Sequence, residues 1–155
     1  MAARTVHVLV GGSADWGTPV RASDELLKTW YEAYLMAKFE FEDRQVHYLK
    51  LRIVGIDEID NDGDVPRGWG SLEFQDLDGD SLWGHVDWYR RDGLDRGTWT
   101  FASGTGKWQG TTGTVDLALF GGPQDHDAEM PPRGPIRYFG WLDGTGEIDA
   151  SGAYT

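Results

Sequence analysis

The sequence predicts an all-β protein: a single antiparallel closed barrel of about eight strands with a short N-terminal helix, formed by one domain over residues 1–155. Short segments of period-two hydrophobicity recur along the chain, and turn dipeptides such as Asp78-Gly79 and Asp92-Gly93 separate them. A closed barrel is favoured because an open sheet would leave exposed edges. A glycine series also breaks the stretch from Arg96 to Asp116, at Gly104, Gly106, Gly110 and Gly113.

The first third of the chain predicts a strand, a helix and a hairpin. Residues 5–11 predict a short strand that ends at Gly11-Gly12. Ser23 offers a side-chain oxygen as a helix cap, and apolar residues then recur on one helical face, which predicts a helix over residues 24–35. A long strand running back to Thr29 is the alternative. The period then changes to two, and residues 35–42 and 46–54 predict a hairpin.

The remainder of the chain predicts strands joined by turns and two irregular loops. Residues 57–68 predict an acidic loop, and residues 121–135, which are rich in proline, predict the second loop. The glycine series is interpreted as turn chemistry rather than as a phosphate-binding loop. The predicted strands cover residues 69–77, 82–90, 97–102, 114–120 and 136–143, with the last strand extended to Ile148.

Composition narrows the classes of function. The net charge of −12 and the pI near 4.5 make nucleic acid and anionic membrane surfaces poor partners, because both are polyanionic. The absence of cysteine excludes disulfides, thiolate metal sites and cysteine nucleophiles. The spacing of the four histidines predicts no metal site, and no cofactor motif is present. The apolar run Val6 to Val10 is too short for a signal peptide, so we expect a soluble, cytoplasmic protein.

Aromatic residues are the most informative part of the composition. They make up 13% of the chain, and eight of them are Trp. Side chains of this kind either fill a core or line a pocket, and in a small barrel the same inward positions serve both purposes. We therefore predict a substrate-binding cavity whose candidate wall residues are Trp83, Trp99, Phe101, Phe139 and Trp141.

One face of the strand 82–90 carries the main candidates for catalysis. On this face His85 would act as acid or base, Asp87 would orient it or act itself, and Tyr89 would donate to a developing oxyanion. The alternative is that this face meets solvent and that Val86 and Trp88 point inward. Arg137 and Glu73 are further catalytic candidates: the first to pair a carboxylate, the second as a carboxyl with a pKa raised by desolvation. A solvated surface position is the alternative for each.

Two segments, GTGKWQGTTGTVDL and IRYFGWLDGTGEI, resemble the β-barrel shared by allene oxide cyclases and dirigent proteins. The resemblance begins at Trp69 and is a pattern of turns rather than of catalytic groups. It implies a calycin-like, eight-stranded barrel whose apolar cavity holds a lipid or phenolic ligand and steers a cyclisation or coupling without a cofactor, often in a trimer. Lipocalin-like barrels remain an alternative, since they also close an aromatic-rich cavity.

These observations predict a cofactor-independent isomerase, cyclase or lyase that acts on an apolar small molecule inside the barrel, as a homo-oligomeric dimer or trimer. A non-catalytic binding or carrier protein for a hydrophobic ligand is the first alternative. A structural subunit whose aromatic outer face forms an oligomer is the second.

Overall fold

A computed structural model describes residues 3–154, which form an almost purely β structure. Two short 3₁₀ helices are present: η1 (Gly106–Trp108) lies between the seventh and eighth strands, and η2 (Ser151–Ala153) follows the last strand. The strands are β1 (Arg4–Trp16), β2 (Val20–Arg21), β3 (Leu26–Phe41), β4 (Val46–Asp60), β5 (Arg67–Asp76), β6 (Ser81–Arg91), β7 (Leu94–Gly104), β8 (Thr112–Pro123) and β9 (Ile136–Asp149).

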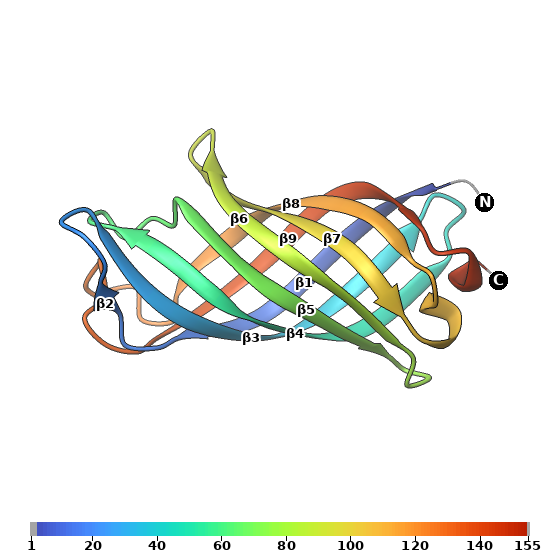
Figure 1. The fold of residues 1–155 in the computed structure, drawn as a ribbon, viewed down its shortest axis with the longest axis horizontal. Helices are drawn as coiled ribbons and strands as arrows, with labels where there is room; N and C mark the ends of the chain where they lie inside the picture. The colour runs from blue at the N-terminus through green and yellow to red at the C-terminus, as the bar shows by residue number, and fades with distance from the viewer. Residues whose placement is uncertain (1–2, 155) are drawn as a thin grey trace.

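Eight of these strands close into an antiparallel barrel, and β2 is a two-residue addition to its rim (Figure 1). From β3 to β9 each strand pairs with the next one in the chain, and β1 pairs with both β9 and β3. The long β1–β3 ladder, from Val6↔Phe41 to Trp16↔Tyr31, removes the open edge that a meander would otherwise leave. The predicted all-β closed barrel of about eight strands is confirmed.

The predicted N-terminal helix over residues 24–35 is wrong, because this segment forms the first half of β3. Ser23 Oγ accepts hydrogen bonds from the backbone N–H groups of Glu25 and Leu26, as a cap would, but no helix follows. The apolar residues divide between two faces instead, with Tyr31 buried and Trp30 and Tyr34 exposed. β4 pairs with β3 from Leu26 to Glu40, while on the other side β1 pairs with Tyr31–Phe41 and β2 with Leu27 and Lys28. These ladders satisfy most of the backbone of the strand, which outweighs the local helical pattern.

The tight turns were predicted correctly from their dipeptides. Asp92 and Gly93 both have positive φ, 56° and 75°, as the central residues of a type I′ hairpin require. Arg44, with φ of 69°, turns β3 into β4, and Gly79, with φ of 86°, lies between β5 and β6. The predicted acidic loop, by contrast, begins too early, since β4 continues through Asp60.

Both termini lie at the same end of the barrel (Figure 1). Aromatic side chains fill this end. Trp108 of η1 is fully buried, packs edge-on against Phe39 and His47, and donates from Nε1 to Asp76 Oδ2 at 2.9 Å. Lys107 pairs with the same carboxylate at 3.0 Å. The glycine-spaced connection between β7 and β8 therefore builds the plug at this end of the barrel.

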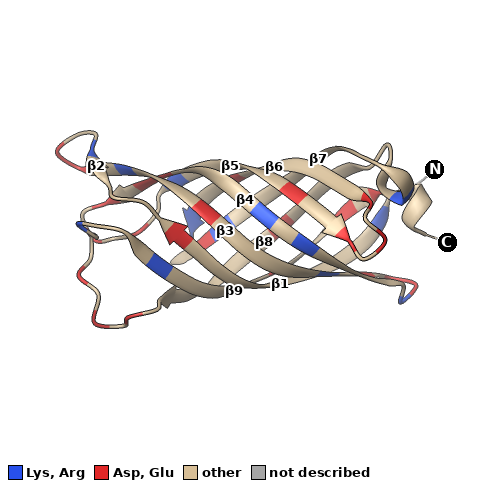
Figure 2. Cartoon of the chain, turned by 90° about the horizontal axis from the view of Figure 1, so that it is seen from below, with Lys and Arg blue, Asp and Glu red and all other residues tan. Residues whose placement is uncertain are grey.

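Charged residues are interspersed along the strands, as Figure 2 shows for β3 and β4. Arg52 of β4 and Glu32 of β3 form one such pair between neighbouring strands, at 2.7 Å. Within residues 3–154 no helix has the length and apolar character that a membrane crossing requires.

Candidate functional site

A cavity of about 660 Å³ lies in the half of the barrel opposite the plug. The inward positions change in size along the strands: Phe39 and Phe74 fill the closed half, whereas Ala14, Ala33 and Gly140 line the cavity. Small inward residues leave space that the large residues of the closed half would occupy. The loop after β4, the β6–β7 turn and the loop before β9 contribute to the open end. The volume falls within the range of small-molecule sites.

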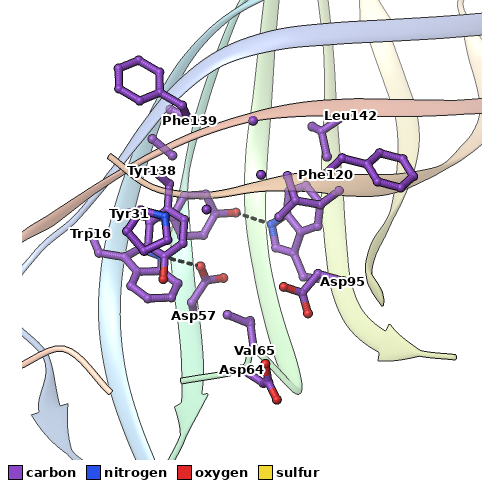
Figure 3. Close-up of a pocket in the computed structure, with 18 of the residues that line it drawn as sticks. Trp16, Tyr31, Asp57, Asp64, Val65, Asp95, Phe120, Tyr138, Phe139 and Leu142 are labelled. Atoms are coloured by element: carbon purple, nitrogen blue, oxygen red, sulfur yellow. Dashed lines mark hydrogen bonds between the residues drawn. The ribbon is translucent and has the colours of Figure 1, made fainter. Parts of the chain in front are cut away.

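Asp57 of β4 is the most unusual residue of the cavity wall. Its Oδ2 accepts a hydrogen bond of 2.8 Å from Trp16 Nε1, while its Oδ1 has no hydrogen-bond partner among residues 3–154 (Figure 3). The residue is only 7% exposed. Burial raises the pKa of the Asp57 carboxyl to about 7, and the like charge of Asp95 adds to the effect. Asp57 is thus a buried acid that can gain or lose a proton near neutral pH.

Glycine on the neighbouring strand makes room for this carboxyl. A Cβ atom added at Gly68 of β5, which pairs with Asp57, would lie 2.2 Å from Asp57 Oδ1. The same device serves Tyr31, because a Cβ at Gly70 would lie 2.4 Å from the Tyr31 hydroxyl. Glycine at two inward positions of β5 therefore leaves room for the Asp57 carboxyl and the Tyr31 hydroxyl.

Tyr31 of β3 occupies the cavity wall beside Asp57 (Figure 3). Its hydroxyl accepts a hydrogen bond from Trp88 Nε1 at 2.8 Å and donates to the Trp69 carbonyl at 3.2 Å. Burial raises the pKa of the Tyr31 phenol well above its usual range, and the charge of Asp57 acts in the same direction. Tyr31 is accordingly a neutral phenol with its proton already engaged, which leaves Asp57 as the group free to exchange a proton.

The open end of the cavity is acidic and aromatic. Arg90 of β6 binds two carboxylates at once, Asp95 at 2.8 Å and Asp64 at 3.3 Å. Burial raises the pKa of Asp95 even with Arg90 in contact. The Tyr138 ring packs on Trp16 with centroids 4.6 Å apart, so two aromatic residues flank the side of Asp57. Among residues 3–154 no three His, Asp or Glu side chains gather as a metal ion would require.

The predicted catalytic face of β6 lies on the outside of the barrel. His85 and Asp87 have side chains 56% and 68% exposed and lie 4.0 Å apart, and Tyr89 shares their face. Trp83 also lies on this outer face and is 38% exposed. The interpretation that this face points into the barrel is wrong, because Leu82, Val86 and Trp88 take the inward positions of the alternation.

The other predicted site residues do not come together in the cavity either. Glu73 and Arg137 are exposed on the outer surface, where Arg137 pairs with Asp15 at 2.7 Å. Trp99 and Phe101 point inward as predicted, but they pack around Phe74 in the filled half. Trp141 is 59% exposed, and Phe139, 48% exposed, borders the cavity with its ring turned away from Tyr138 (Figure 3). The exposed candidates face solvent because side chains alternate along a strand, and each of them lies next to a residue that points inward.

Sequence reasoning missed Trp16, Tyr31, Asp57 and Trp88 as residues of one site. For Asp57 a signal was present: the inward positions Leu49, Leu51, Ile53, Gly55, Asp57 and Ile59 continue one period-two series through the carboxyl. The acidic composition of residues 57–68 concealed that series. Tyr31 was hidden by the helical spacing, and the pairing of its hydroxyl with Trp88, 57 residues away, has no local signature.

Comparison of the chain with protein family models, with curated proteins and with solved structures finds no match. The resemblance to allene oxide cyclases and dirigent proteins therefore stays a prediction.

Proposed function

We propose that this protein is a cofactor-independent enzyme, an isomerase, cyclase or lyase, that binds an apolar small molecule in the open half of the barrel and moves a proton on it with Asp57. The observation that carries the proposal is the buried Asp57 carboxyl, which borders the cavity and has one oxygen without a hydrogen-bond partner among residues 3–154. Small-molecule sites are usually cavities with mostly apolar walls and a few polar groups, and a buried group with a perturbed pKa in such a cavity marks a candidate site.

The chemistry follows from the surroundings of the carboxyl. With a pKa near 7, Asp57 is present in both protonation states at neutral pH, as a residue needs to be if it takes a proton from a substrate and returns it. Trp16 holds Oδ2, so Oδ1 is the atom that exchanges the proton. The walls formed by Tyr31, Leu119 and Leu142 would hold the substrate body against this atom, and positioning alone can supply a large part of the rate.

Binding without turnover is the second candidate function. It is favoured by the lining, in which glycine, alanine and aliphatic or aromatic side chains outnumber polar ones. In a carrier of this kind Asp57 would orient the ligand and exchange no proton with its carbon atoms. The two functions differ in one measurable step, the exchange of substrate hydrogen with solvent.

The experiment screens apolar ketones, alcohols and amines for binding by thermal shift, and then incubates each bound compound with the protein in D₂O. For an enzyme we expect deuterium bound to carbon, which mass spectrometry detects after the O–D and N–D positions are exchanged back in H₂O, and a loss of roughly 10²-fold or more in exchange rate for Asp57→Asn at saturating compound. Asp87→Asn, a matched change on the outer face, should exchange as the unaltered protein does. Binding with no exchange would establish the carrier, and no binding by any compound would reject both functions.

A further inference from the structure

We propose that the cavity takes an apolar amine, whose ammonium group donates a hydrogen bond to Asp57 Oδ1. This inference rests on the proposed function, because it names the substrate class of the same site. It follows from three features of the cavity: the vacant acceptor, the balance of charge around it and the aromatic residues beside it.

The vacant acceptor requires a donor on the ligand. Asp57 Oδ1 lies against Gly68 and is closed off in this structure, and no group in residues 3–154 donates a hydrogen bond to it. A ligand in the cavity reaches this oxygen when the carboxyl turns toward it. A buried carboxylate oxygen without a donor is costly, and a ligand that donates to it recovers that cost. Hydroxyl and ammonium groups both donate, whereas a carboxylate or sulfonate ligand has no proton to offer and would place like charge against Asp57.

The balance of charge selects the ammonium over the hydroxyl and excludes anions. The charged residues that border the cavity are four aspartates and one arginine. Arg90 is already engaged by Asp64 and Asp95, so it is not free to bind an anionic head group. The four aspartates are Asp57, Asp62, Asp64 and Asp95. A cation entering this cavity meets an attractive potential, and an anion meets a repulsive one.

Aromatic residues surround the point where the ammonium group would lie. Trp16, Tyr31 and Tyr138 gather on one side of Asp57 in Figure 3, and Trp88 reaches the same wall through its bond to Tyr31. Aromatic rings attract cations through their electron-rich faces and pack equally well against an apolar body. Carboxylate and rings together therefore suit a ligand with an apolar body and a cationic end.

The same arrangement gives Asp57 a proton to take. Transfer of one proton from the ammonium nitrogen to Asp57 Oδ1 breaks an N–H bond and forms an O–H bond. The product is a neutral amine beside a neutral carboxylic acid, and desolvation favours the neutral form of both groups. The freed nitrogen lone pair is the nucleophile that a cyclisation or isomerisation within the substrate would use, and the proton returns from Asp57 afterwards.

The test compares three ligands that share one body: 4-phenylbutylamine, 4-phenylbutan-1-ol and 4-phenylbutyrate, each titrated at pH 7.5 by calorimetry. We expect the amine to bind at least about tenfold more tightly than the alcohol, and the carboxylate not to bind detectably. Asp57→Asn should bring the amine down to the affinity of the alcohol, while Asp87→Asn should leave the order unchanged.

A second variant makes the test independent of Asp57. Combining Asp64→Asn with Asp95→Asn removes both carboxylates that pair with Arg90 and leaves its hydrogen bond to the Gly93 carbonyl, so 4-phenylbutyrate should begin to bind and the advantage of the amine should shrink. If the alcohol or the carboxylate binds the unaltered protein as tightly as the amine, the inference is overturned while the proposed function stands. If none of the three ligands binds, the inference is overturned, and the wider screen of apolar compounds decides the proposed function separately.

Discussion

At the scale of single residues, Asp57 shows how a strand can carry a functional group inside a barrel. The carboxyl occupies an inward position of β4 that an aliphatic residue would normally take, between Ile53 and Ile59 in the same register. Trp16 supplies one hydrogen bond, and Gly68 leaves the space. Trp16 and Gly68 thus let the carboxyl be buried, but they leave one of its oxygens without a hydrogen bond from residues 3–154. Buried polar groups left in this state often mark functional sites.

Asp57 should make the stability of the protein depend on pH. Its pKa rises from 3.8 to about 7 on folding, so the folded state binds more protons than the unfolded state between these values, and the free energy of unfolding falls as pH increases through this window. This loss of stability is absent below pH 3.8 and reaches an upper limit of about 4 kcal/mol above pH 7.

Asp57→Asn removes this titration, so the variant should gain stability relative to the unaltered protein as pH rises from 4 to 8. Urea unfolding at the two pH values measures the difference. Asp87→Asn, on the outer face, is the control and should show a constant difference. If the difference in free energy of unfolding between Asp57→Asn and the unaltered protein is the same at both pH values, Asp57 does not have the raised pKa assigned to it.

At the scale of elements, the connection from β7 to β8 converts a glycine-rich stretch into a plug. Gly106 and Gly110 have positive φ, 54° and 75°, which L side chains rarely adopt, and between them η1 turns Trp108 into the barrel. The prediction of turn chemistry for this stretch is confirmed. The buried indole joins the connection to Phe39 and Asp76.

Removal of this indole should destabilise the barrel without touching the cavity. Trp108→Ala should lower the free energy of unfolding by about 3–5 kcal/mol. Trp108→Phe, which keeps a ring but removes the indole hydrogen bond to Asp76, should lower it by about 1–3 kcal/mol. Trp141→Ala on the outer surface should cost less than either. Denaturant unfolding measures all three, and equal losses for Trp108 and Trp141 would argue against a plug.

At the scale of the whole molecule, the barrel is filled at one end and hollow at the other. The inward residues of β3 show the division along one strand, from Phe39 in the core, through Ala37, to Ala33 and Tyr31 at the cavity. Closure of the sheet supplies stability through the aromatic half, and the other half is free to hold a ligand. A substitution of an inward residue should therefore affect ligand binding in the hollow half of the barrel and stability in the filled half.

The same substitution at two heights tests this division. Ala33→Phe places a ring into the cavity, so the protein should stay folded and lose at least about tenfold in affinity for small molecules. Ala37→Phe is the matched change at the inward position four residues further along β3, where the barrel is packed. It should lower the free energy of unfolding by about 1–3 kcal/mol. Thermal unfolding and ligand titration of both variants provide the measurement; equal effects at the two positions would contradict the two-part interior.

Much of the fold followed from local patterns, whereas most of the candidate site did not. Hairpin dipeptides such as Asp92-Gly93 specify their own backbone, so the turns were placed correctly. The face of a strand that points inward is a property of the closed sheet, and on β6 both faces carry aromatic residues, so His85 and Asp87 were assigned to the wrong side. Tyr31 and Asp57 lay in segments whose local composition suggested a helix and a loop.

The sequence by itself determined a barrel of short-turned strands, because alternation and turn residues act within a few positions of one another. Only the tertiary structure decided which residues meet inside it. Trp16, Tyr31, Asp57 and Trp88 come from four different strands, and their contacts depend on the registers β1–β3, β3–β4, β4–β5 and β5–β6 taken together. A shift of one residue in any of these would turn a side chain to the other face, so the site exists only once every register is set.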